Sequence, residues 1–343
     1  MNIGILGSGS WGTALAKILT DNGQHIRWWN RNEKAIDYLR QRRHNPHYLS
    51  TVYFDTSKIS LTHEAEQVVR ESDHLVVAVP SSYVAGVFEK LDAADLTGKK
   101  VISAVKGMLP QEEELLNDHL SRKFRFPLND YFAILGPCHA EEVAAEKLSY
   151  LTFSGIDTRA ARHIADQFTT PYLNTVVNGD IYGVQFAAIL KNIYALGAGI
   201  AHGLEYGDNF LSVLIANSAA EMNSFLTLSR SHYPSGKPLD GETIESESKG
   251  YGASVYLGDL LVTCYSLFSR NRTFGNMIGK GYSVKAATME MNMVAEGFNA
   301  SKCVYRVNRR IGASMPIAET VYRILWEQLP ASVGFEAIEK QLV

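Results

Sequence analysis

The feature that most constrains this chain is a glycine pattern close to its N-terminus. The segment "MNIGILGSGSWGTALA" carries G-x-G-x-x-G at residues 7–12, after a short β-branched run at Asn2–Leu6. A helical pattern of apolar residues follows over Ser10–Thr20, and a second strand is expected at His25–Trp29. Strand, glycine turn, helix and strand thus occupy about thirty residues, which is typical of a dinucleotide-binding unit. The context favours this interpretation over a chance glycine turn.

Each glycine of the pattern has a physical role in such a unit. Gly7 permits a tight turn, Gly9 lets the backbone approach a pyrophosphate, and Gly12 lets the helix pack closely on the strand. The diphosphate would lie at the helix N-terminus, where backbone N–H groups favour anions. The pattern therefore predicts NAD or NADP as cofactor.

The end of the second strand normally selects between these two cofactors. An acidic residue there would bind the ribose 2′-hydroxyl of NAD, but "RWWNRNE" places Asn30 and Arg31 at this position. A guanidinium suits a 2′-phosphate, so we expect NADPH to be tolerated. The alternative is that Arg31 stacks on the adenine or is solvated. The pattern does not rank NADH against NADPH.

Three later segments are expected to be strands that end at the same edge of a parallel sheet. They are "HLVVAVP", "KKVISAVKGM" and "YFAILGPCHAEEV". Ligands bind beyond the carboxyl ends of such strands, so topology places Lys106 and Gly136 beside the cofactor. We expect a helix from about Cys138 to Lys147, and further strands over residues 151–177.

The period of the apolar residues becomes helical from Asp180 onward. The chain has 343 residues, which exceeds the roughly 100–200 of one domain. We therefore predict an α/β Rossmann-like, doubly wound dinucleotide-binding domain at residues 1–179. An all-α substrate-binding and catalytic domain is predicted at residues 180–343.

A lysine and an arginine-containing cluster are the candidate functional groups of this second half. Lys191 interrupts the apolar run "DIYGVQFAAILKNIYALGAGIAHGL", where burial would lower its pKa towards that of an acid–base group. A lysine that extends its ammonium to water at a domain interface is the alternative. Ser269-Arg270-Asn271-Arg272 could hold a phosphate by charge-assisted hydrogen bonds, or form a solvated basic corner.

The balance of charges excludes several classes of partner. Lys plus Arg is 33 against 36 for Asp plus Glu, a net charge of −3, which argues against nucleic acid or anionic membrane as main partner. The three cysteines form no C-x-x-C pair, so we expect a reduced cytoplasmic protein without structural zinc. We expect no secretory signal and no membrane span, because the most apolar helix carries Lys191, Asn192 and His202.

Several motifs in order resemble the NAD(P)-dependent glycerol-3-phosphate dehydrogenases of the bacterial type, nearly end to end. They are "GSGSWGTALA", "AVKGM", "GPCHAEEV", "KNIYALGAGIAHGLEYGDN", "LGDLLVTCYSLFSRNRTFG", "VAEGFNA" and "MPIAETVYRIL". The resemblance implies interconversion of sn-glycerol 3-phosphate and dihydroxyacetone phosphate with NAD(P)H. It also implies a homodimer that supplies glycerol 3-phosphate for phospholipid synthesis.

The resemblance further implies roles for individual residues. Lys191 would be the catalytic acid–base, with Lys106 lowering its pKa and Asp259 orienting it or a substrate hydroxyl. The implied cofactor contacts are Gly7, Gly9, Ser10, Trp11, Gly12, Arg31, Lys106, Ala140, Arg270, Val294 and Glu296. The implied substrate contacts are Lys106, Gly136, Cys138, Lys191, Asp259, Ser269, Arg270 and Asn271.

Two departures from the family pattern bear on specificity. Cys138 stands where the family usually has serine after Gly-Pro, and a thiol is a poor donor, so a backbone contact is the alternative there. The polar stretch Ser231–Ala253 is longer than usual, and could be a lid, a partner surface or a neutral insertion. A related β-hydroxy-acid dehydrogenase would not need the cluster at residues 269–271, and a non-catalytic NADPH sensor would not need buried lysines.

Overall fold

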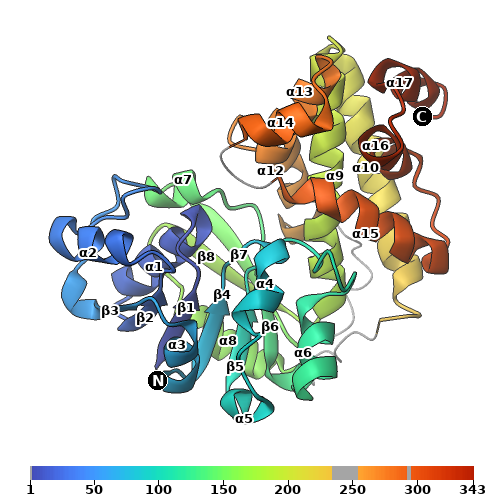
Figure 1. Cartoon of the computed structure of the whole chain (residues 1–343). Helices are drawn as coiled ribbons and strands as arrows, with labels where there is room; N and C mark the ends of the chain where they lie inside the picture. The colour runs from blue at the N-terminus through green and yellow to red at the C-terminus, as the bar shows by residue number, and fades with distance from the viewer. Residues whose placement is uncertain (1, 234–253, 292–294) are drawn as a thin grey trace. The chain divides into compact units, whose positions relative to one another are not determined.

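The computed structural model describes residues 2–233, 254–291 and 295–343, in two compact units (Figure 1). The first unit contains the described residues up to Val105 and the segment Glu114–Ile181. The second contains Lys106–Glu113 and the described residues from Tyr182 onward. The short segment that carries Lys106 thus belongs to the helical unit, although the residues before and after it in the sequence belong to the unit with the sheet.

The first unit contains a sheet with eight described strands, in the order β3-β2-β1-β4-β5-β6-β7-β8. Figure 1 shows this sheet. Neighbouring strands are parallel except β6 and β7, which are antiparallel. The first six strands have the doubly wound order of dinucleotide-binding domains, which confirms the predicted fold class. The strands are β1 (Ile3–Leu6), β2 (Ile26–Trp29), β3 (Ile59–Thr62), β4 (His74–Val77), β5 (Lys100–Ser103), β6 (Tyr131–Leu135), β7 (Ser149–Ser154) and β8 (Leu173–Asn178).

Helices cover this sheet and bury its apolar strands. Every residue of β1 and β4 is buried, as expected of central parallel strands. The helices of the first unit are α1 (Ser10–Asp21), α2 (Glu33–Arg42), α3 (Ala65–Glu71), α4 (Ser81–Val87), α5 (Ala93–Leu96), α6 (Leu116–Phe124), α7 (Ala140–Ala144) and α8 (Thr158–Asp166).

Two expectations for the end of this unit are confirmed in the kind of element and wrong in its extent. The helix expected at residues 138–147 is shorter, because His139 is its N-cap residue and α7 ends at Ala144. Residues 151–177 are not all strand, because α8 lies between β7 and β8. These two strands are parallel, and a parallel pair needs a crossover connection. The Asp157 side chain caps α8 by accepting a hydrogen bond from the backbone N–H of Ala160.

The regular elements described in the second unit are all helices, as predicted (Figure 1). Its first helix, α9, is long and apolar enough to cross a membrane, but its apolar window is wholly buried inside the protein, as in a core helix. A π-helical segment at Ser254–Gly258 leads directly into α12. The helices are α9 (Ile181–Gly203), α10 (Asp208–Ser229), α12 (Asp259–Tyr265), α13 (Arg270–Gly279), α14 (Val284–Glu290), α15 (Glu296–Ile311), α16 (Pro316–Trp326) and α17 (Ala331–Glu339).

Glycines let α13 pack directly on the backbone of α9. A Cβ at Gly199 of α9 would lie 2.1 Å from the Arg272 carbonyl oxygen, and a Cβ at Gly275 of α13 would lie 2.1 Å from the Leu196 carbonyl oxygen. No side chain fits at such distances, so the crossing requires glycine on both helices. This crossing fixes the start of α13, with Arg270 and Asn271, relative to the helix that carries Lys191.

We expect Gly275→Ala to lower the stability of the protein. The added methyl group would force the two backbones apart, and overpacking of this kind costs about 1–3 kcal/mol. The matched control is Gly86→Ala in α4, where an added Cβ meets no atom within 4 Å. That change should raise stability slightly, since alanine is the better helix former. Thermal unfolding should show opposite shifts in Tm, and a Gly275→Ala variant as stable as the wild type would contradict the close crossing.

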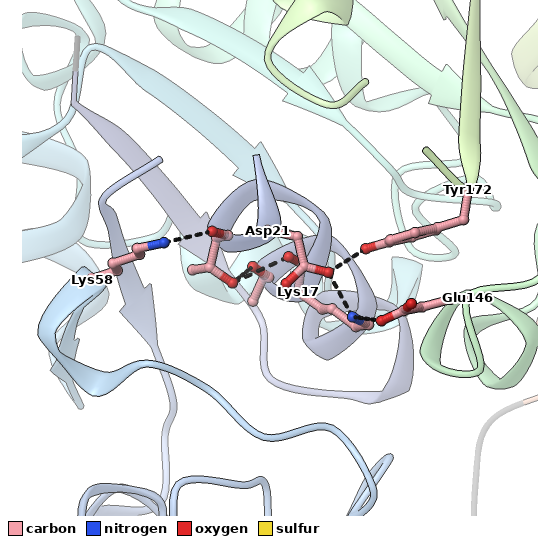
Figure 2. Close-up of polar contacts among 7 residues, drawn as sticks. Lys17, Asp21, Lys58, Glu146 and Tyr172 are labelled. Atoms are coloured by element: carbon pink, nitrogen blue, oxygen red, sulfur yellow. Dashed lines mark hydrogen bonds and ion pairs between the residues drawn. The ribbon is translucent and has the colours of Figure 1, made fainter. Parts of the chain in front are cut away.

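A polar cluster anchors the C-terminal end of α1 (Figure 2). The Lys17 ammonium donates to the carboxylates of Asp21, at 2.6 Å, and Glu146, at 2.9 Å. The Tyr172 hydroxyl donates to Asp21 at 2.6 Å. Burial alone would lower the pKa of Lys17, but the bonds to the two carboxylates outweigh it and raise the pKa. The cluster connects α1 to two other segments of the unit: Glu146 follows α7, and Tyr172 directly precedes β8.

Candidate active site

The glycine pattern has the geometry that the sequence predicts for it. Gly7 has φ of +126°, which favours glycine, and a Cβ at Gly12 would lie 2.2 Å from the Gly7 carbonyl oxygen. A Cβ at Gly9 would meet no described atom within 4 Å, so open space faces this position. Helix α1 begins at Ser10 with Gly9 as its N-cap residue, which has no side chain to bond the first N–H groups. These residues therefore fit the diphosphate of a dinucleotide.

Arg31 lies directly after β2, at the position expected to contact the adenosine ribose. Its guanidinium carbon is 6.0 Å from the centre of the Tyr83 ring, which comes from α4, and the two side chains form a cation–π pair. Asn30 turns inward, and its side-chain oxygen accepts from the backbone N–H of Asn32. A cation rather than a carboxylate thus stands at this strand end, which is compatible with a 2′-phosphate.

Gly136, Cys138 and Ala140 lie together after β6. Gly136 has φ of +143°, and a Cβ there would lie 2.7 Å from the Tyr150 carbonyl oxygen of β7. The buried Cys138 thiol donates to that same oxygen at 3.2 Å. The thiol is thus engaged by the sheet, which favours a backbone contact at this position over a side-chain one. Ala140 begins α7.

Lys191 and Asp259 form a buried ion pair in the helical unit. The Lys191 ammonium contacts Oδ1 of Asp259, and the two side chains are only 4% and 2% exposed. The second oxygen of Asp259, Oδ2, is buried and has no hydrogen-bond partner among the described residues. A buried carboxylate oxygen without a partner is costly, and it could accept a hydrogen bond from a hydroxyl of a bound substrate.

The surroundings of Lys191 shift its pKa to a range useful for proton transfer. The pKa is lowered to about 8: burial is the largest cause and lowers it, the Asp259 carboxylate opposes this by attraction, and the nearby Lys106 ammonium adds to the lowering. The direction and the effect of Lys106 are those expected from the sequence. An amine with this pKa is present in both protonation states near neutral pH.

Asn192 is a residue whose role the sequence analysis missed. Its side-chain amide donates to the Lys106 carbonyl oxygen at 3.0 Å, and its side-chain oxygen accepts from Asn271 at 2.8 Å. The Asn271 side-chain oxygen in turn accepts from the Gly297 N–H at 2.9 Å. Asn192 therefore links the backbone beside Lys106 to the starts of α13 and α15. The only signal was a second polar residue beside Lys191 in an apolar run.

The predicted phosphate cluster is the beginning of α13. The Ser269 side chain caps this helix by accepting from the backbone N–H of Arg272 at 3.3 Å, and Arg270 is the first helical residue. Ser269 and Asn271 are buried, whereas Arg270 is half-buried. An arginine as the first residue of a helix is suited to phosphate binding, because the helix start also offers backbone N–H groups.

The remaining predicted residues are placed as follows. Glu296 is the first residue of α15, next to the Gly297 that bonds Asn271. Val294 and most of the polar stretch Ser231–Ala253 lie outside the described residues. The segment after Lys106 is anchored at its far end by an ion pair between Glu113 and Arg306 of α15. The predicted site residues thus fall into one set in each unit.

A doubly wound sheet with this glycine turn, followed by helices that bury a lysine–aspartate pair, defines a nicotinamide-nucleotide-dependent oxidoreductase. The comparisons identify the family. The family model for the N-terminus of NAD-dependent glycerol-3-phosphate dehydrogenase matches residues 2–161, and the model for its C-terminus matches residues 180–336. The chain belongs to the family of NAD-dependent glycerol-3-phosphate dehydrogenases.

Individual relatives agree with the family models along nearly the whole chain. The glycerol-3-phosphate dehydrogenase [NAD(P)+] of Staphylococcus carnosus is 33% identical over 96% of this chain and 94% of its own length. That of Chlorobium limicola is 35% identical over 96% of this chain and 95% of its own. The crystal structure of glycerol-3-phosphate dehydrogenase from Coxiella burnetii has a TM-score of 0.85 at 26% identity, covering 98% of both chains.

Proposed function

We propose that this protein interconverts sn-glycerol 3-phosphate and dihydroxyacetone phosphate with NAD(P)H, and that Lys191 is its acid–base group. The observation that carries the residue assignment is the buried pair of Lys191 and Asp259, with the pKa of Lys191 lowered to about 8. Membership of the family supports the reaction. NAD(P) supplies or accepts the hydride when bound, and the residues of the chain move the proton.

Lys191 carries out the proton transfer. In the reduction of the ketone, the Lys191 ammonium donates a proton to the oxygen that becomes the C2 hydroxyl. In the oxidation of the alcohol, the neutral amine accepts that proton. Proton transfer by a positioned side chain contributes about 10²–10⁴-fold to rate.

Lys106 and Asp259 set the state of Lys191 and orient the substrate. The Lys106 ammonium stabilises the neutral form of Lys191 by repulsion, and it stabilises negative charge that develops on the substrate oxygen. The free Oδ2 of Asp259 accepts a hydrogen bond from a substrate hydroxyl, while Oδ1 holds the Lys191 ammonium.

The start of α13 binds the substrate phosphate in this proposal. Arg270 contributes the charge, and the first N–H groups of the helix contribute further donors. The Asn271 side chain is engaged by Asn192 and Gly297, so its contribution to binding is chiefly to place this helix start. Binding energy obtained at the phosphate holds C2 of the substrate beside Lys191.

The domain organisation, the oligomeric state and the cellular location are also part of the proposal. We propose two domains, residues 1–179 for the cofactor and 180–343 for the substrate, in a homodimer located in the cytoplasm. Glycerol 3-phosphate made there would supply phospholipid synthesis. The net charge of −3 argues against nucleic acid or an anionic membrane as the main partner.

The direct test is oxidation of NADPH and of NADH, followed by absorbance, after addition of dihydroxyacetone phosphate to the purified protein. We expect turnover with the phosphorylated ketone and none with unphosphorylated dihydroxyacetone. The ratio of the two rates would report the cofactor preference that Arg31 leaves open. Protein that binds NADPH but turns over no dihydroxyacetone phosphate would disprove the proposed substrate.

The pH dependence of kcat/KM should follow the protonation of Lys191 in opposite directions for the two reactions. Reduction needs the ammonium, so its kcat/KM should be constant at low pH and fall as pH rises through about 8. Oxidation needs the neutral amine, so its kcat/KM should rise with pH and level off above the same value. Initial rates in both directions over a range of pH check this, and a reduction rate that rises with pH would contradict the role of Lys191.

A further inference from the structure

Three consecutive carbonyl oxygens of the glycine turn each accept a hydrogen bond from a buried side chain. The Gly7 carbonyl accepts from Nε1 of Trp28 at 2.8 Å, and the Ser8 carbonyl accepts from Nδ2 of Asn45 at 3.0 Å. The Gly9 carbonyl accepts from the hydroxyl of Thr13 at 2.9 Å, in addition to the helical bond from the Thr13 backbone N–H at 2.9 Å. The donor side chains are at most 1% exposed, whereas Ser8 and Gly9, which accept two of the bonds, are half-buried.

Asn45 is the centre of this arrangement, although it lies in the loop after α2 and far along the chain. Besides Ser8, its amide nitrogen donates to the Thr13 hydroxyl at 2.9 Å. Its side-chain oxygen accepts from the backbone N–H groups of His47, at 3.0 Å, and Tyr48, at 3.3 Å. Both amide hydrogens and both lone pairs are thereby used, so the side chain has one orientation in which all its bonds are made.

The electrostatics of diphosphate binding require that these carbonyl oxygens be held away from the anion. Each peptide unit of the turn presents either its N–H or its C=O towards the site, and only the N–H attracts phosphate. A carbonyl fixed by a donor on the protein side keeps its peptide unit in the productive orientation before the cofactor arrives. The Gly7 peptide has a second restraint, because Gly12 packs against its oxygen.

We propose that Asn45, together with Thr13, is a positioning residue for the dinucleotide diphosphate, which it orients through the carbonyls of Ser8 and Gly9 without touching the cofactor. The inference depends on dinucleotide binding alone, and not on the substrate of the reaction. Asparagine is specifically suited, because aspartate of the same shape has no donor for the Ser8 carbonyl. Its charge would repel both that oxygen and the diphosphate.

The test is the Kd for NADPH of the Asn45→Asp variant, measured by quenching of tryptophan fluorescence without substrate. We expect Kd to rise roughly ten- to a hundredfold, since buried donors and acceptors lose their partners. In assays, KM for NADPH should rise similarly, whereas kcat at saturating NADPH and KM for dihydroxyacetone phosphate should stay within about twofold. A purely structural role would lower Tm without this separation of KM from kcat.

The matched control is Asn22→Asp at the opposite end of α1, where the Asn22 amide donates to the carbonyl oxygens of Asp166 and Gln167. This variant should lose stability and keep its Kd for NADPH. A second pair of variants tests the proposal if Asn45→Asp does not fold. Thr13→Val removes the hydroxyl, whereas Thr13→Ser keeps it. Weaker NADPH binding by the valine variant alone supports the proposal.

Two results would overturn the inference. One is folded Asn45→Asp protein with a wild-type Kd for NADPH, and the other is equal Kd values for Thr13→Val and Thr13→Ser. Both are binding results, so they are separate from failure of the proposed reaction, which would appear as wild-type protein that binds NADPH without turnover.

Discussion

Replacement of Lys191 by alanine is expected to lower kcat for reduction of dihydroxyacetone phosphate by about 10²–10⁴-fold, the usual contribution of a positioned acid–base group. The ammonium that protonates the developing hydroxyl is then missing, and no other lysine contacts Asp259 among the described ion pairs. KM for NADPH should change little. Steady-state kinetics at a pH below 8 measures the loss.

Loss of the fold must be separated from loss of chemistry in this variant. Lys191→Ala leaves the Asp259 carboxylate buried without its cation, and breaking a buried pair costs about 3–5 kcal/mol. The double variant Lys191→Ala with Asp259→Asn removes both charges, so it should recover most of the lost Tm and none of the activity. Either variant retaining a tenth of the wild-type kcat would exclude Lys191 as the acid–base group.

The parts of the fold that depend on local patterns could be predicted from the sequence. The strand, glycine turn and helix at the N-terminus are specified by neighbouring residues, and so is the apolar helix that carries Lys191. Helix α8 also has a local pattern, which was not recognised: Asp157 is suited to an N-cap, and the buried Ala161, Ile164 and Ala165 follow at helical spacing. What the sequence could not show is the parallel pairing of β7 and β8, a long-range feature. The end of α7 lies beside Glu146, whose carboxylate bonds Lys17, 129 residues away in the sequence.

The candidate site shows the same division. Lys191 could be singled out because a lysine in an apolar run is costly, and Arg270 because of its neighbours. Asn45 and Asn192 could not, since their importance lies in partners that are 37 and 79 residues away, Ser8 and Asn271. Asn45 lies in a loop and has no distinctive pattern, and Asn192 stood out only as a second polar residue beside Lys191 in an apolar run. The role of either residue becomes visible only in the structure, where both the nitrogen and the oxygen of its side-chain amide make hydrogen bonds.

The structure also separates two residues that the sequence treated as one phosphate-binding pair. Asn271 is buried, and both ends of its side chain are bonded within the protein, to Asn192 and to the backbone of Gly297. Arg270 is half-buried and opens α13. We therefore propose that Arg270 supplies the charge that recognises phosphate, and that Asn271 holds the helix start in place.

Arg270→Ala is accordingly expected to reduce kcat/KM for dihydroxyacetone phosphate by about a hundredfold. Hydrogen bonds to charged groups contribute about 1.5–3 kcal/mol each, and an arginine can make two of them to one phosphate. Kd for NADPH should rise no more than about threefold.

The control for loss of one positive charge is Arg309→Ala, in the last turn of α15 within the same unit. It should retain wild-type kcat/KM, because a charge exposed to solvent is screened. Kinetics with varied dihydroxyacetone phosphate and direct titration with NADPH distinguish the two possible roles of Arg270. Equal losses in substrate and cofactor affinity would assign Arg270 to the cofactor, and the helix N-terminus of α13 would then be the principal phosphate site.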